Sequence, residues 1–74
     1  MARIEVKSEI AGKVWKIEAP AGTDLDEDDA IIILESMKME IPVAAPVRCR
    51  VVELRVGEED AVAEDQIIAI VETL

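Results

Sequence analysis

The amino-acid sequence predicts an all-β fold, a compact sandwich or flattened barrel, because its apolar periodicity is that of strands. The runs 30–34 and 67–71 are short, continuously apolar and rich in β-branched residues, which indicates strands buried on both faces. Apolar residues alternate with charged ones over 15–19 and 52–56, as they do along a strand. Acidic or Gly/Pro-containing segments lie between these runs and are expected to form turns.

An internal repeat indicates one closed domain. Two copies of a half are too few for a solenoid, so we expect a single pseudo-twofold domain over 1–74, with halves at about 8–35 and 45–72. The joining segment, 36–44, is then expected to protrude as a hairpin opposite the two chain ends. The repeat appears when the chain is aligned with itself at a shift of 37 residues, which needs no gap and matches Val14 with Val51, Asp28 with Asp65, Ile31 with Ile68, Ile33 with Ile70 and Glu35 with Glu72.

The composition limits the classes of binding partner and the cellular compartment that we expect for this protein. The formal net charge is −9, from 17 acidic and 8 basic residues, so neither nucleic acid nor a membrane surface is expected as a partner. No apolar run approaches the ~20 residues that a membrane span requires. Charged residues are spaced through 1–7, where a signal peptide would need its apolar stretch. Trp15 is the sole aromatic residue, so the core should be aliphatic, with Cys49 as an unreactive filler. These features predict a cytoplasmic protein.

The residue types that are missing exclude most catalytic sites. Without His, Tyr or Asn, the chain cannot form a Ser-His-Asp or Cys-His arrangement or a usual zinc site, so we expect no enzyme activity from it alone. The acidic segment 24–35 matches an EF-hand calcium loop at several ligand positions. Asp29, however, stands where that loop requires glycine, and Pro20 and Pro42 flank it where helices would be needed. We therefore expect no metal site.

The tetrad 36–39, Ser-Met-Lys-Met, lies at the midpoint of the repeat and is the candidate functional site. A hairpin tip there would expose Lys38 on a rigid stalk, within reach of a modifying enzyme and of distant active sites. Met37 and Met39 would add soft apolar contact surface that suits several partners. A ligase would have to supply the base and the activated acyl donor, because the chain holds no base for this step. Taken alone, the tetrad leaves open a solvated turn with two methionines.

The stretch 35–43, Glu-Ser-Met-Lys-Met-Glu-Ile-Pro-Val, closely resembles the biotinylation hairpin of the biotin/lipoyl-attachment domain family, most of all its biotin carboxyl carrier domains. The resemblance extends to 12–17, 45–47 and 60–62, and covers the chain from about 8 to 72. It implies a flattened barrel of two four-stranded antiparallel sheets related by pseudo-twofold symmetry. The chain ends would lie in one sheet and the modified lysine at a tight turn in the other.

The resemblance also implies that Lys38 carries biotin through an amide bond. The ureido nitrogen of biotin would accept carboxylate in a biotin carboxylase, and a carboxyltransferase would pass it to an acceptor. Tethering would let the cofactor visit both active sites without leaving the complex, and the chain looks like a free-standing carrier. The implied contacts for biotin protein ligase and for these partners are Met37 and Met39, and the supporting residues are Ser36, Glu35 and Glu40.

Three turns depart from the family pattern. Arg48-Cys49 replaces the usual Asp-Gly, Asp28-Asp29 replaces the common Gly-Gln, and Glu59 stands at a usual glycine position. Because a non-glycine residue at positive φ costs about 1 kcal/mol, we expect local differences in these turns. The attachment site itself is not affected.

Two other functions stay open. Lipoyl carriers share the fold, but their lysine typically follows an aspartate and precedes a small residue, where Met37 and Met39 stand here. This difference favours biotin over lipoate on the same Lys38. An unmodified interaction barrel would use the fold merely as structure and would leave the Met-Lys-Met tip unexplained.

Overall fold

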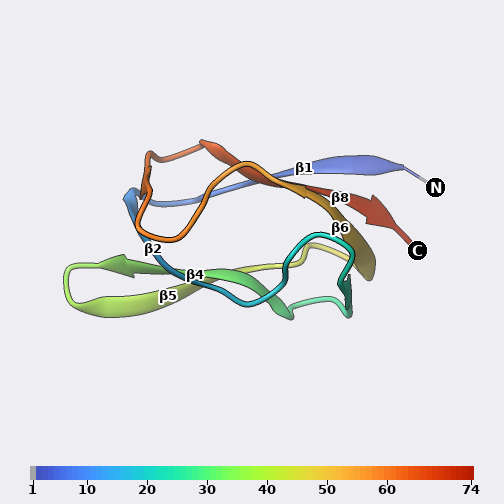
Figure 1. The fold of residues 1–74 in the computed structure, drawn as a ribbon, viewed down its shortest axis with the longest axis horizontal. Helices are drawn as coiled ribbons and strands as arrows, with labels where there is room; N and C mark the ends of the chain where they lie inside the picture. Colours follow the sequence, from blue (N-terminus) through green and yellow to red (C-terminus); the bar gives the residue numbers. More distant parts are fainter. Residues whose placement is uncertain (1) are drawn as a thin grey trace.

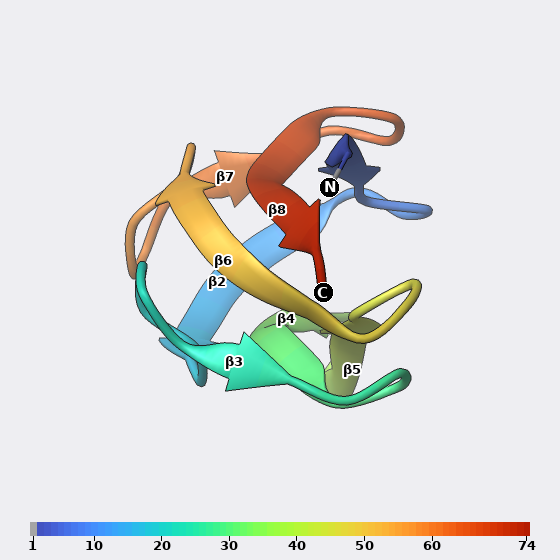
Figure 2. The same cartoon turned by 90° about the vertical axis from the view of Figure 1, so that its right-hand side faces the viewer.

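The strand-like runs fold into two four-stranded antiparallel sheets in a computed structural model that describes residues 2–74. The strand order is β1-β8-β6-β3 in one sheet and β5-β4-β2-β7 in the other (Figure 1, Figure 2). No helix in this part of the chain is long and apolar enough to cross a membrane. The predicted all-β class with two four-stranded sheets is confirmed. The strands are β1 Arg3–Lys7, β2 Gly12–Ile17, β3 Asp24–Leu25, β4 Ala30–Ser36, β5 Met39–Ala44, β6 Cys49–Leu54, β7 Ala61–Val62 and β8 Ile67–Thr73.

The two sheets repeat one another at the spacing of 37 residues. At this spacing β2 matches β6, β3 matches β7 and β4 matches β8, while β5 matches β1 as the outermost strand of its sheet. One sheet contains β1 and β8, the first and last of the strands, and the other contains the β4–β5 hairpin. The molecule measures 36 × 17 × 17 Å, and the hairpin tip and the chain ends lie at opposite ends of its long axis (Figure 1). The expected pseudo-twofold arrangement is therefore present.

A β-bulge in β2 turns Trp15 out of the core. The register of β2 against β4 shifts between Val14 and Lys16, so that Trp15 is the additional residue. Val14 is fully buried, whereas Trp15 is 47% exposed. An equivalent shift follows Val51 in β6. The predicted alternation, in which Trp15 and Ile17 face the same side of the strand, is therefore wrong. The additional residue of a bulge reverses which side chains face inward.

The core is aliphatic, as expected, and β4 and β8 supply most of its largest side chains. In each strand a bulge turns two successive residues inward, at Ile31–Ile32 and at Ile68–Ala69. Ile33 and Ile70, which come next at matching positions, are only partly buried. The prediction that the runs 30–34 and 67–71 are buried on both faces is thus correct at the two bulges and wrong at Ile33 and Ile70.

The turns that lack the usual glycines keep a glycine-like backbone. Asp28 has a φ of 74° and Glu59 a φ of 76°, and Gly22, the repeat equivalent of Glu59, has a φ of 94°. The backbone N–H of Asp28 donates to the carbonyl of Ala45 at 2.9 Å, and that of Glu59 to the carbonyl of Val14 at 2.8 Å. The expected local differences are therefore absent from the φ angles of these two residues, because hydrogen bonds to distant segments hold the strained conformation.

Replacing Asp28 with glycine is expected to stabilise the protein by up to about 1 kcal/mol. Glycine adopts the φ of 74° found there without the clash that a β-carbon meets in the left-handed region. Glu27→Gly is a matched control in the same turn, since Glu27 is exposed and is not among the residues with positive φ. Urea denaturation of both variants should show a gain for the first and a loss of roughly 0.5–1 kcal/mol for the second. A loss at both positions would contradict this explanation.

The thiol of Cys49 is expected to be unreactive in the native protein, which agrees with its predicted role as a core filler. Cys49 is fully buried at the start of β6, and burial raises the pKa of its thiol. As the pH rises, the unfolded state loses this proton first, so stability should fall from the ordinary thiol range upward. A thiol reagent at neutral pH should therefore label Cys49 only after denaturant is added. Rapid labelling of the native protein would show that the site opens readily.

Candidate functional site

The tip of the β4–β5 hairpin is a two-residue turn made of Met37 and Lys38. Ser36 pairs with Met39 on either side of it. Met37 has a φ of 51° and Lys38 a φ of 65°. Positive φ at both central residues is what a type I′ turn requires, and such turns match the twist of a hairpin. Neither residue is the glycine or asparagine that usually stands there, so each carries a steric cost on the order of 1 kcal/mol.

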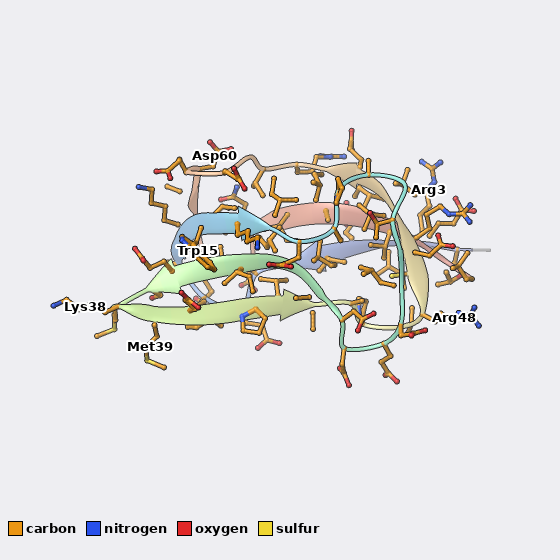
Figure 3. All side chains as sticks on the ribbon, turned by 60° about the horizontal axis from the view of Figure 1, so that its bottom comes forward. Arg3, Trp15, Lys38, Met39, Arg48 and Asp60 are labelled. Atoms are coloured by element: carbon orange, nitrogen blue, oxygen red, sulfur yellow. The ribbon has the colours of Figure 1, made fainter. Side chains whose placement is uncertain are left out.

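The side chains of the tip extend into solvent. Figure 3 shows Lys38 pointing away from the barrel beyond the end of the hairpin, with Met39 beside it. Met37 is 92% and Met39 62% exposed, and Lys38 is exposed as well. None of the ion pairs found among residues 2–74 involves Lys38. Its amine is therefore open to a partner from outside.

Strand β2 supports the base of the hairpin through a close backbone contact at Gly12. Lys13 and Val14 pair with Glu35 and Leu34 of β4. A β-carbon on Gly12 would lie 2.9 Å from the backbone carbonyl oxygen of Glu35, closer than such atoms normally approach. Only glycine fits at this position without a backbone shift. Sequence reasoning gave Gly12 no role of its own, although a single glycine at the start of a strand is a known signal of close approach.

Two carboxylates lie opposite each other behind the tip. Glu35 and Glu40 pair across β4 and β5, and both are exposed. Lys13, which is next to Glu35 on β2, binds Glu59 instead, with 2.8 Å between the amine and the carboxylate. The hydrogen bond and the charge of Glu59 raise the pKa of Lys13, and the charge of Glu35 adds a smaller contribution. The like-charged pair costs some stability and makes the surface behind the tip acidic.

The chemistry of the tip suits covalent attachment. A primary amine that is exposed and forms no ion pair within residues 2–74 can be acylated, and Figure 3 shows that Lys38 points away from the barrel. The exposed methionines beside it offer apolar contact without rigid shape. The predicted supporting residue Ser36 is half-buried at the end of β4. The tip can thus carry an acyl group on the amine of Lys38.

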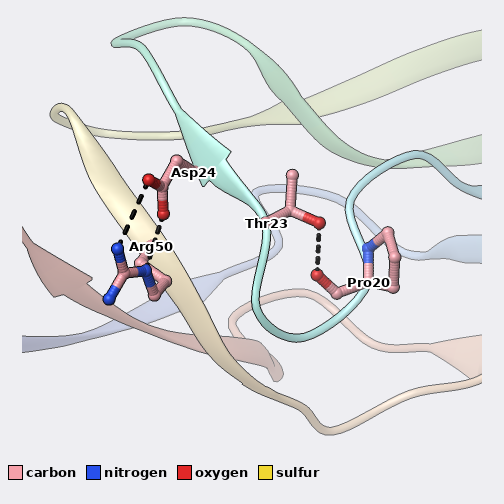
Figure 4. Close-up of polar contacts among 4 residues, drawn as sticks. All are labelled: Pro20, Thr23, Asp24 and Arg50. Carbon is pink, nitrogen blue, oxygen red and sulfur yellow. Dashed lines mark hydrogen bonds and ion pairs between the residues drawn. The ribbon is translucent and has the colours of Figure 1, made fainter.

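The acidic segment 24–29 does not gather its carboxylates into a metal site. Asp24 instead accepts a hydrogen bond from Nε of Arg50 at 2.6 Å, and this bond holds the pKa of Asp24 below its usual range (Figure 4). The hydroxyl of Thr23 donates to the carbonyl of Pro20 at 2.7 Å and closes the preceding turn. Among residues 2–74, no group of three or more His, Cys, Asp or Glu side chains could hold a metal ion.

Sequence comparison places this hairpin in a family. Residues 12–71 match the family model of biotin and lipoyl attachment domains, which is described as "Biotin-requiring enzyme". The chain is 38% identical over 63 residues to the "Biotin/lipoyl attachment protein" of Bacillus subtilis, covering 85% of this chain and 86% of that protein. It is 34% identical over 67 residues to the "Biotinylated protein TB7.3 homolog" of Mycobacterium leprae, covering 90% of this chain and 94% of that protein.

Solved structures share the fold. One is a single-chain, multi-domain long-chain acyl-CoA carboxylase, with a TM-score of 0.91 at 26% identity. Another is the urea carboxylase of Kluyveromyces lactis, with a TM-score of 0.91 at 28% identity. Each match covers 97% of this chain but only 7% and 6% of the respective carboxylase, so the chain corresponds to a small part of those enzymes. The family match over most of its length shows that the chain belongs to the biotin/lipoyl attachment family.

Proposed function

We propose that this chain is a biotin carrier that acts through Lys38. The observation that carries the proposal is the position of Lys38, an exposed amine that forms no ion pair within residues 2–74, on the two-residue turn at the opposite end of the molecule from the C-terminus. The biotinylated relatives and the match to two carboxylases support biotin as the group attached. The buried thiol of Cys49 supports the cytoplasm as the location.

The chain would present Lys38 to three partners in turn: a biotin protein ligase, a biotin carboxylase and a carboxyltransferase. Met37 and Met39 would contact each of them, since flexible apolar side chains adapt to different surfaces. Glu35 and Glu40 would orient the approach by charge. Biotin would supply a ureido nitrogen that takes up carboxylate in one active site and releases it in the other. The catalytic groups for these reactions would belong to the partners.

Attachment would form an amide bond between Nζ of Lys38 and the carbonyl carbon of an activated biotin. The bond from that carbon to the activating group would break, and the activating group would leave with the bonding electrons. A base of the ligase would take the proton that the amine loses. The contribution of the chain is to hold the amine clear of the barrel, on a turn that pairing of β4 with β5 keeps in one conformation.

Intact mass after co-expression with a biotin ligase tests the proposal. The wild-type chain should gain the mass of one biotinyl group and bind streptavidin, and Lys38→Arg should do neither. Lys16→Arg is a matched control, because Lys16 is also exposed but lies within β2, beside Glu18. It should be biotinylated like the wild type. Biotin on the Lys38→Arg variant, or an unmodified wild type, would disprove the proposal.

Lipoate remains the second candidate for the same amine. One relative, at 38% identity, is named for attachment of either biotin or lipoate. Expression with a lipoate ligase, followed by the same mass measurement, separates the two groups by the mass of the adduct. A chain that gains neither group would instead act as an unmodified interaction barrel.

A further inference from the structure

A groove of about 460 Å³ lies between β1 and β5, the outermost strands of the two sheets. Figure 2 shows these strands on the same side of the molecule. The groove is lined chiefly by residues 4–9 and 41–46, which are equivalent in the repeat. It therefore consists of two related halves, and its volume falls in the range of small-molecule sites.

One half of the groove lies close to the tip of the hairpin. Ile41 lines it and is the third residue after Lys38. Ile10 also lines it and comes two residues before Gly12, which packs against the hairpin at Glu35. The other half lies toward the chain ends. There Ile4, the repeat equivalent of Ile41, pairs with a residue of β8 near its end.

The walls of the groove offer both apolar and hydrogen-bonding groups. Ile10 and Ile41 are half-buried, so part of each side chain is available for contact. Among residues 2–74, β1 pairs only with β8 and β5 only with β4, so each strand has one edge whose backbone groups lack a strand partner. Pro42, which lines the groove next to Ile41, has no N–H and offers only its C=O as an acceptor. A cyclic urea has N–H donors and a carbonyl acceptor, which are the groups that a strand edge pairs with. The groove thus offers apolar and hydrogen-bonding contacts to an uncharged ring system with a urea group, although Glu5, Lys7, Glu9 and Asp28 also line it.

The arm that biotin would form on Lys38 is long enough to reach the near half. From Cα of Lys38 to the rings it spans about eleven covalent bonds, or roughly 13 Å when extended at the ~1.2 Å per bond of an extended chain. Along β5, Ile41 lies about 10 Å from Lys38 at ~3.3 Å per residue. Ala45, in the far half, lies about 23 Å away on the same scale. The arm can therefore reach only the half that contains Ile41.

We propose that the tip-side half of the groove between β1 and β5 is a resting site for the biotinyl group that the same chain carries on Lys38. This inference rests on the proposed carrier function. The rings pack against Ile10 and Ile41, and the urea pairs with the free backbone edges. Because the group is tethered, even weak contacts hold it there for part of the time, and a partner active site competes for it.

Amide chemical shifts of the wild-type chain before and after biotinylation test the resting site. The expected result is a change at Ile10 and Ile41, in addition to changes at the modified turn, with none at Ile4 or Ala45 in the far half. Changes confined to residues 36–39 would overturn the inference. Intact mass of the same sample shows separately whether Lys38 carries biotin. A missing adduct would refute the carrier function, and the resting site with it.

A matched pair of variants tests the same site through streptavidin capture. Ile41→Ser removes an apolar wall of the near half, and Ile4→Ser makes the same change at the equivalent position of the far half. Once biotinylated, Ile41→Ser should be captured by streptavidin up to about twofold faster than the wild type, the gain expected when the wild-type biotin rests in the groove for up to about half of the time. Ile4→Ser should be captured at the wild-type rate. Equal rates for all three proteins would contradict the resting site.

Discussion

Replacing Leu34 with alanine is expected to lower the free energy of unfolding by about 2–5 kcal/mol. Leu34 is fully buried in β4, where it belongs to the hydrophobic core directly below the hairpin. Removing its side chain leaves a cavity that the surrounding strands can fill only in part. A chain of 74 residues has a total stability of roughly 4–11 kcal/mol at ~0.05–0.15 kcal/mol per residue. This one substitution should therefore remove much of the stability of the fold.

Urea denaturation followed by circular dichroism measures this loss, and Ile33→Ala is the control. Ile33 is the preceding residue of the same strand and is only partly buried. Its replacement should cost clearly less than that of Leu34, because fewer of its atoms leave water when the chain folds. Equal losses would mean that Leu34 is not the more deeply buried of the two side chains. The slope against urea should stay the same in both variants.

Replacing Gly12 with alanine is expected to cost about 1–3 kcal/mol, although it adds only one methyl group. The added β-carbon would lie 2.9 Å from the backbone carbonyl oxygen of Glu35. Because that oxygen belongs to a paired strand, it cannot move aside as a flexible side chain would. We expect the pairing of β2 with β4 to loosen next to the hairpin. Amide hydrogen exchange should then speed up at Glu35 and Ser36 more than in β6 or β8.

Gly57→Ala is the matched control for this prediction. A β-carbon on Gly57 would meet only a side-chain oxygen of Asp60, at 3.6 Å, which is an ordinary contact. Gly57 is also not among the residues with positive φ. Its replacement should leave stability unchanged or raise it by up to ~1 kcal/mol, since alanine reduces the entropy of the unfolded chain. A loss at Gly57 as large as at Gly12 would show that the close contact is not the cause.

The candidate site was largely predictable, because it depends on local sequence and on the repeat. The segment 36–39 joins two equivalent halves, and any closed pseudo-twofold arrangement places such a segment at a turn. Lys38 lies at the exposed tip, as expected, with Met37 and Met39 beside it. The left-handed backbone of the turn was not predictable from residue type, since methionine and lysine rarely adopt it. Pairing of the two strands imposes it.

It was less predictable which side chains of each strand face the core and which face solvent. Trp15 continues an alternating apolar pattern, yet it is exposed because a bulge adds one residue just after Val14. A bulge depends on how two strands pair, and composition alone does not reveal the register. The same reason explains Asp28 and Glu59, which adopt the positive φ of the usual glycines because the hydrogen bonds that their N–H groups donate to other segments hold them.

The sequence by itself therefore determined the all-β class, the two equivalent halves and the placing of Lys38 at the turn between them. These properties follow from the periodicity of the apolar residues and from the internal repeat, and both can be read from the sequence alone. Only the tertiary structure decided that Gly12 supports the hairpin, that Trp15 faces solvent and that β1 and β5 enclose a groove. Each of these depends on which residues meet across strands that are distant in sequence, and the bulges set that register.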